Sequence, residues 1–145
     1  MAARKGRFTT IYVDNATGTP TDISSNVITT EGIPLTYDEI EVGGFGAAAK
    51  SYISGRADVP ITLEGQFDAT VHALFKDWVG DDTDVRTVTF QYGNNAAATT
   101  GDPEIEGEYI CSEYSVSSEL DGMQMFRLKL ALGSGQSIPA YGTVA

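Results

Sequence analysis

The sequence is poor in the residues on which most catalytic and metal sites depend. It contains one cysteine, Cys111, and one histidine, His72. A lone cysteine cannot form a disulfide within the chain, which is typical of proteins made in a reducing compartment. One cysteine and one histidine are also too few of the preferred ligands for a zinc site. We therefore expect no disulfide, no metal site and no cofactor.

Basic residues are scarce as well. Nine lysines and arginines stand against twenty aspartates and glutamates, which gives a net charge of -11 and a pI near 4.2. Such a charge opposes binding to nucleic-acid phosphates or to an anionic membrane surface. No run of about eighteen apolar residues could span a membrane. The basic start, with Arg4, Lys5 and Arg7, lacks the apolar stretch of a secretory signal. Because of the acidic charge and the lack of a spanning segment, we expect no membrane partner.

Hydrophobic residues make up 41% of the 145 residues, which is enough for one globular domain over 1–145. Apolar residues alternate with polar ones in most segments, and this period of two is typical of strands with one buried face. The pattern predicts a mainly β fold, an antiparallel β-sandwich or barrel with one flanking α-helix and a long inter-strand loop. The expected strands span 8–13, 23–30, 35–42, 59–67, 85–92, 105–118 and 123–132. The segment 137–145 is expected to form either a last short strand or an extended tail.

A helix is expected over 68–80. Asp68 can accept hydrogen bonds from the first amides of this helix, and Gly80 can end it. The residues between them place apolar side chains on one stripe, which can cover an open face of the sheet. The stripe consists of Val71, Leu74, Phe75, Trp78 and Val79.

The segment 43–56 is expected to be a long loop between the strands 35–42 and 59–67. It exceeds the two to five residues usual in a hairpin, and loops of this length are commonly functional or disordered. It carries Phe45, Tyr52 and Ile53, which solvent alone would not favour. In the strand before the loop, we expect Ile40 and Val42 to point inward and the acids to point outward.

Other motifs in the sequence favour no enzyme. Gly44 to Ala49 has the G-x-G-x-x-A spacing of a dinucleotide site, but too few residues follow for the required crossover helix. His72 lies off the apolar stripe and is expected to be solvated, with no G-x-S-x-G motif nearby. The acids in 81–84 lack the glycine and glutamate of a calcium-binding EF-hand loop.

The segment 102–121 holds seven acids and no base. One interpretation is a solvated outer face of the sheet. The other is a surface that repels phosphate, because Glu106 and Glu108 share one face of a strand. If such strands repeated around a ring, they would line a strongly negative channel.

Several features between 36 and 94 occur together in one order. They are the acidic strand Tyr37–Val42, the loop through Gly44-Phe45-Gly46 and Lys50–Gly55, the strand Ile61–Asp68, the helix with Leu74-Phe75 and Asp77-Trp78, and the strand ending Phe90–Asn94. In their order and spacing they resemble the tail tube, or major tail, proteins of long-tailed non-contractile bacteriophages. No single short motif carries this resemblance, which covers about the middle forty per cent of the chain.

The resemblance implies a virion protein made in the host bacterial cytoplasm. It implies that six copies close into a ring, that rings stack into a tube, and that DNA leaves through the lumen without specific binding. Tape measure, tail terminator and distal tail proteins are the implied partners, and no appended immunoglobulin-like domain is expected. The long loop and the basic start are the expected contacts between subunits or rings: Arg4, Lys5, Arg7, Phe45, Lys50, Tyr52, Ile53 and Arg56. The acidic lumen candidates are Glu39, Glu41, Glu106 and Glu108.

Three other functions stay open. One is a related ring-forming assembly protein, such as a tail terminator or a secretion-system tube. Another is a small-ligand or carbohydrate-binding sandwich, in which Trp78, Tyr109 and Tyr114 would line a pocket. The least favoured is an enzyme, because no catalytic set of residues is apparent.

Overall fold

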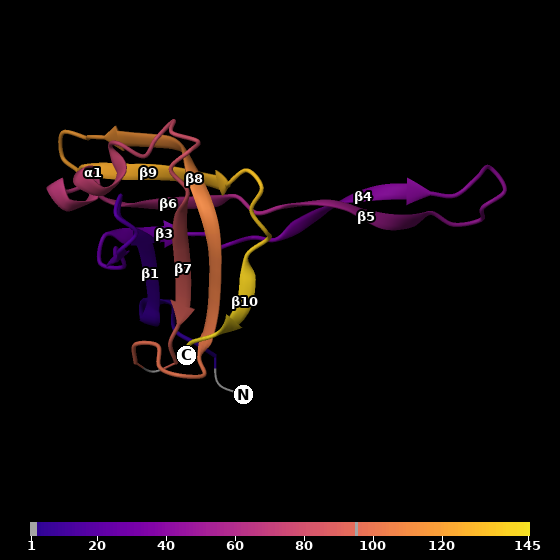
Figure 1. The fold of residues 1–145 in the computed structure, drawn as a ribbon, viewed down its shortest axis with the longest axis horizontal. Coiled ribbons are helices and arrows are strands. Elements are labelled where there is room, and N and C mark those ends of the chain that lie inside the picture. The colour runs from indigo at the N-terminus through magenta and orange to yellow at the C-terminus, as the bar shows by residue number, and fades with distance from the viewer. Residues whose placement is uncertain (1–2, 95) are drawn as a thin grey trace.

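The computed structural model describes residues 3–94 and 96–145, which form antiparallel strands with one α-helix among them (Figure 1). The helix is α1 (Ala69–Phe75), and a short 3-10 turn, η1 (Gly6–Phe8), precedes the first strand. The predicted mainly β antiparallel fold with one helix is confirmed. The strands are β1 (Thr9–Asp14), β2 (Pro20–Asp22), β3 (Val27–Thr30), β4 (Thr36–Val42), β5 (Ser51–Asp58), β6 (Ile61–Gln66), β7 (Arg86–Tyr92), β8 (Pro103–Ser117), β9 (Met125–Leu132) and β10 (Ala140–Thr143).

Eight of these strands form one sheet in the order β2-β1-β7-β8-β9-β6-β3, with β10 paired to β8. The long strand β8 joins two halves of the sheet, since its first part pairs with β7 and β10 and its second part with β9. A register shift between Cys111 and Glu113 interrupts the pairing with β9, as expected for a bulge that bends a strand. In Figure 1, β3, β6 and β9 run crosswise to β1, β7 and β10, so the sheet folds over on itself.

The core lies between the two halves of this sheet. Strand β9 shows the predicted alternation, with Phe126, Leu128 and Leu130 buried. Phe75 of α1 packs against Phe126 and Tyr114, with ring centroids 6.0 Å apart in both pairs. The helix therefore covers the open face of the sheet, as its apolar stripe predicted.

The helix begins as expected and ends early. The Asp68 carboxylate accepts a hydrogen bond from the Val71 amide at 2.8 Å, which is the expected N-cap. Beyond Phe75 the chain tightens, since the Trp78 amide donates to the Phe75 carbonyl at 3.1 Å. Trp78 is buried as predicted, but Val79 is exposed and bridges to Cys111 instead of extending the stripe.

Arg86 is the buried charged side chain of the described core. Its guanidinium donates to the Leu74 carbonyl at 2.8 Å and to the Asp84 carboxylate at 2.9 Å. It also lies over the Trp78 ring, with 4.9 Å from its central carbon to the ring centroid. These contacts satisfy the guanidinium donors and fix the end of α1 against β7.

Two strand predictions near the start need correction. The short strand β2 begins at Pro20, outside every expected strand, and only the second half of the expected strand 23–30 forms β3. Ile23 is buried and its amide donates to the Ile11 carbonyl, so the chain stays beside β1 just after β2. None of the described helices has the length and apolar character of a membrane span.

Candidate assembly interface

Strands β4 and β5 form a two-stranded sheet separate from the eight-stranded one. We call residues 36–58 the arm and the rest of the chain the body. The arm projects well beyond the body (Figure 1). The expected loop 43–56 is thus wrong over its second half, because residues from Ser51 onward form β5 and pair with β4.

Cross-strand contacts explain why this segment forms a hairpin. Ile40 lies opposite Ile53, and two β-branched side chains facing each other stabilise a strand pair. The Ser51 hydroxyl donates to the Val42 carbonyl at 2.9 Å and closes the outer end. Near the base the register shifts, and a Cβ on Gly55 would lie 3.0 Å from the Asp38 Cβ, so glycine permits the close approach there.

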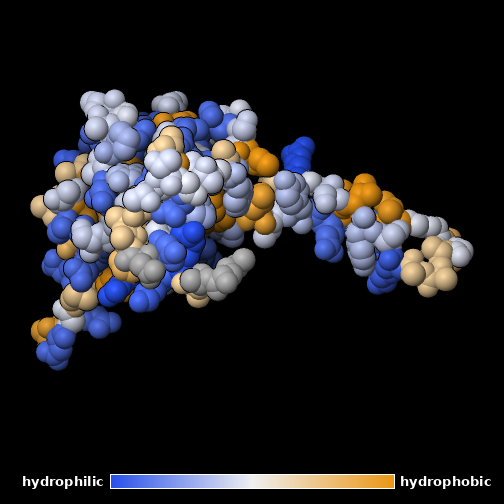
Figure 2. Space-filling model, turned by 90° about the horizontal axis from the view of Figure 1, so that it is seen from below, coloured by the Kyte–Doolittle hydropathy of each residue, from blue (hydrophilic) through white to orange (hydrophobic). Residues whose placement is uncertain are grey.

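The arm has two unlike faces. Ile40, Val42 and Ile53 share one face, because directly opposed residues point the same way and β4 alternates. Glu39, Glu41 and Tyr52 share the other face by the same rule. Figure 2 shows hydrophobic residues gathered along one side of the arm and hydrophilic residues along the other.

All of β4 is exposed, so the prediction that Ile40 and Val42 point into the core is wrong. Their alternation with acids reflects an apolar face that lies outside the core of the chain. Neither residue is therefore recognisable from the sequence as part of an exposed site, although the alternation itself is visible.

The tip of the arm presents one large aromatic side chain. Phe45 is fully exposed and is flanked by glycines and alanines. Gly43, which begins the turn, has a φ of 142°, a region that favours glycine. The Ala47 amide donates to the Gly44 carbonyl at 3.0 Å, so this stretch forms a turn in place of a dinucleotide-binding helix.

The base of the arm is held firmly by the body. Ile33 and Val59, which flank the arm in the sequence, are both buried. The Tyr109 hydroxyl donates to the Val59 carbonyl at 2.9 Å, and the Tyr141 hydroxyl donates to the Ile33 carbonyl at 3.1 Å. A two-stranded hairpin alone is marginally stable in water. The two tyrosines therefore fix where the arm leaves the body, and nothing in their sequence context indicated this role.

The predicted contact residues divide between two places. Phe45, Lys50, Tyr52, Ile53 and Arg56 all lie on the arm. The predicted basic residues of the N-terminal segment lie on the body. Among these, Arg4 is already bound, because it donates to the Tyr92 carbonyl at 2.9 Å and to the Asp102 carboxylate at 3.1 Å. Lys5 and Arg7 are exposed.

The predicted lumen acids also divide, because Glu39 and Glu41 lie on the arm while Glu106 and Glu108 lie on β8. On β8 they share a face with Glu104, which accepts a hydrogen bond from Gln91 at 3.1 Å. Desolvation, a hydrogen bond with Glu104, and the charges of its acidic neighbours raise the pKa of Glu106. This row is thus an acidic surface of the body.

The residues considered above for catalysis, metal binding or carbohydrate binding make contacts within the fold instead. The His72 ring lies 3.1 Å from the Tyr114 hydroxyl, and Cys111 is buried, which raises its pKa to about 11. Trp78 and Tyr109 are fully buried, so they do not line a carbohydrate pocket. Across the described ranges, no group of three or more histidine, cysteine, aspartate or glutamate side chains could hold a metal ion.

Comparison by sequence gives no relative. No protein-family model matches the chain, and no curated protein matches it.

Comparison with solved structures shows a shared fold. The tail of an empty gene transfer agent particle with C6 symmetry matches with a TM-score of 0.70 and 16% identity, covering 95% of this chain and 100% of that one. The sheath–tube complex of an extracellular contractile injection system matches with a TM-score of 0.70 and 15% identity, covering 98% and 93%. The SPP1 tail tube matches with a TM-score of 0.66 and 12% identity, covering 97% and 80%.

Proposed function

We propose that this chain is a structural subunit of the tail tube of a phage or phage-like particle. The main observation that supports this proposal is the exposed arm. Its apolar face and its tip are exposed, although the base is anchored to the body. Exposed apolar surfaces of this kind mark sites of protein association. The fold shared with a tail, a tail tube and a sheath–tube complex supports a tube as the product of that association.

In this proposal, copies associate head to tail. The arm and the body are different surfaces, so a contact between the arm of one copy and the body of another is heterologous, and such contacts form rings or filaments. We propose that six copies close into a ring and that rings stack. The proposed contact residues are Ile40, Val42, Phe45, Lys50, Tyr52, Ile53 and Arg56 of the arm and Lys5 and Arg7 of the body.

The acidic row on β8 is the proposed lining of the lumen. Glu104, Glu106 and Glu108 point away from the core on neighbouring positions of one strand face. Repeated around a ring, they would repel phosphate and let DNA pass without specific binding. The protein would then act in the virion tail after synthesis in the bacterial cytoplasm, with tape measure, tail terminator and distal tail proteins at the ends of the tube.

A second candidate is the tube of a contractile system. The match to a sheath–tube complex is as good as the match to the gene transfer agent tail, so the fold favours neither. The resemblance found in the sequence favours the non-contractile type. A tube in a contractile system would carry a sheath around it, so binding of a sheath protein to preformed tubes separates the two candidates.

Negative-stain microscopy of the purified protein tests the proposal. We expect rings or tubes of uniform width that lengthen at higher protein concentration. A protein that stays monomeric at high concentration in both low and high salt would contradict the proposal. Single rings that never stack would favour the alternative of a tail terminator.

A further inference from the structure

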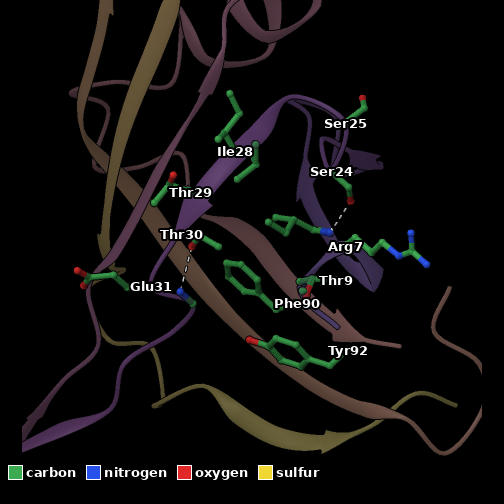
Figure 3. Close-up of a pocket in the computed structure, with 14 residues that line it drawn as sticks. Arg7, Thr9, Ser24, Ser25, Ile28, Thr29, Thr30, Glu31, Phe90 and Tyr92 are labelled. Carbon is green, nitrogen blue, oxygen red and sulfur yellow. Dashed lines mark hydrogen bonds between the residues drawn. The ribbon is translucent and has the colours of Figure 1, made fainter. Parts of the chain in front are cut away.

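A groove on the body lies between β3 and the chain around η1 and β1 (Figure 3). Its volume is about 750 Å³, within the range of pockets that hold drug-sized ligands. Figure 3 shows Phe90 and Tyr92 between Thr9 and Arg7 on one side and β3 on the other. Phe90 is fully buried beneath the groove, whereas Tyr92 is partly exposed. The groove therefore offers the Tyr92 ring within a polar rim, which is a form of pocket that can take one aromatic anchor.

One wall of this groove is the edge of the sheet. Strand β3 is last in the strand order, and within the described residues it pairs only with β6. An unpaired edge leaves backbone donors and acceptors available to another chain, and proteins usually cover or protect such edges. Ile28 lies on this strand and is exposed. The groove thus combines apolar surface with an open strand edge.

Most basic side chains that form no ion pair within the described residues lie on the arm or beside the groove. Four basic side chains form ion pairs within the described chain: Arg4, Arg86, Arg127 and Lys129. The other basic side chains form none there, and all but Lys76 lie either on the arm or in the segment 5–7 beside the groove. The arm also carries Glu39 and Glu41, and the rim of the groove carries Glu31. Each surface therefore holds both a base and an acid that could pair with the other.

From these observations, and resting on the proposed function, we propose that the groove between β3 and β1 receives the tip of the arm of another copy. Phe45 enters over Tyr92, and Lys50 meets Glu31 at the rim. The arm projects away from its own body, so the occupant is a second copy (Figure 1). The small residues around Phe45 let the backbone of the tip approach the edge of β3.

Engineered cysteines test this contact. Ala47→Cys places a thiol on the tip and leaves Phe45 in place, and Ser25→Cys places one on the groove. The native Cys111 is buried and its thiol stays protonated at neutral pH, so it does not compete. After assembly and mild oxidation of the double variant, we expect a ladder of covalent oligomers on a non-reducing gel, and its loss after reduction.

The matched control pairs Ala47→Cys with Ser137→Cys, another exposed serine on the body, outside the groove. We expect no ladder from it. If the first double variant polymerises but gives no ladder, or if the control gives a ladder instead, the groove is not the contact site. Either result would leave the proposed function standing. If the wild-type protein does not assemble at all, the groove proposal and the proposed function both fail.

Charge reversal gives a second measurement that needs no cysteine. Glu31→Lys should reduce the amount of sedimented polymer, because it places a base opposite Lys50. Adding Lys50→Glu should restore polymer towards the wild-type amount, because the pair is present again with its charges exchanged. A double reversal that assembles no better than Glu31→Lys alone would contradict the pairing of the tip with this groove.

Discussion

The double substitution Ile40→Thr and Ile53→Thr should separate assembly from folding. Both side chains lie on the apolar face of the arm, opposite each other, with 49% and 53% of their surface exposed. Threonine is β-branched and suits a strand, so the hairpin should persist while its face becomes polar. Substitutions of exposed residues usually change the free energy of unfolding by less than about 0.5 kcal/mol. The stability of the unassembled subunit should therefore be nearly unchanged.

The cost should appear in assembly instead. Full burial of an isoleucine side chain contributes about 1.5–3 kcal/mol, so burying the exposed half of each gives roughly 1.5–3 kcal/mol for the pair. At about 1.4 kcal/mol per tenfold change in an equilibrium constant, the critical concentration for polymerisation should rise about 10- to 100-fold. Sedimentation over a dilution series measures that concentration, and denaturation in urea below it measures stability.

A control variant on the opposite face of the arm is Ser54→Thr, which changes the hairpin without removing apolar surface from the Ile40 face. We expect its critical concentration to stay near that of the wild type. The reasoning would be refuted if the double variant assembled at the wild-type concentration. A loss of more than about 2 kcal/mol in unfolding free energy would also refute it, since that would mean that both side chains pack within the subunit.

Three further predictions concern the subunit itself, each measured at concentrations too low for assembly. Phe75→Ala should lower the free energy of unfolding by about 3–5 kcal/mol in urea, because this fully buried ring joins α1 to β9; a loss below about 1 kcal/mol would contradict that role. Hydrogen bonds from the Val71 amide and Asn26 lower the pKa of Asp68, so its contribution to stability is present above its usual pKa and is lost as the pH falls through the lowered value. Asp68→Asn keeps an N-cap residue, so its Tm should fall less on acidification than that of the wild type, and an equal fall would contradict this. Desolvation and neighbouring carboxylates raise the pKa of Glu106, so its charged form disfavours folding. Glu106→Gln should raise the Tm at neutral pH, and this difference should shrink as the pH falls through the raised pKa and be lost below the usual glutamate pKa; a lower Tm at neutral pH would count against the acidic row.

Much of the fold could be predicted from local sequence. The helix was visible because Asp68 as N-cap and the apolar stripe point to one segment, although it ends at Phe75 and not at Gly80. Strand β9 was visible because Phe126, Leu128 and Leu130 alternate with polar residues. These signals depend on periodicity and capping, which the sequence records directly.

The arm could not be predicted from periodicity and capping. Ile40 and Val42 alternate with acids, and this period is the same whether the apolar face covers the core of the chain or lies on a projecting arm. Strand β5 was hidden by the glycines and alanines before it and by Gly55 within it. Its pairing places Ile40 opposite Ile53, and this neighbour relation becomes visible only once the register is known.

The anchors of the arm were hidden for another reason. Tyr109 and Tyr141 reach carbonyl groups far from them in the sequence, at Val59 and Ile33. The groove is likewise built from β3, β7 and the start of the chain, which meet only in the folded sheet. Contacts between such distant segments follow from topology, so neither composition nor spacing could indicate them.

A reconstruction of the assembled protein by electron cryo-microscopy tests the central claim most directly. The account predicts stacked rings in which residues 36–58 of each subunit lie against the body of another copy, with Phe45 and the face of Ile40 and Ile53 removed from solvent. Assemblies in which the arm extends freely into solvent, or a protein that forms no assembly under any condition, would contradict it.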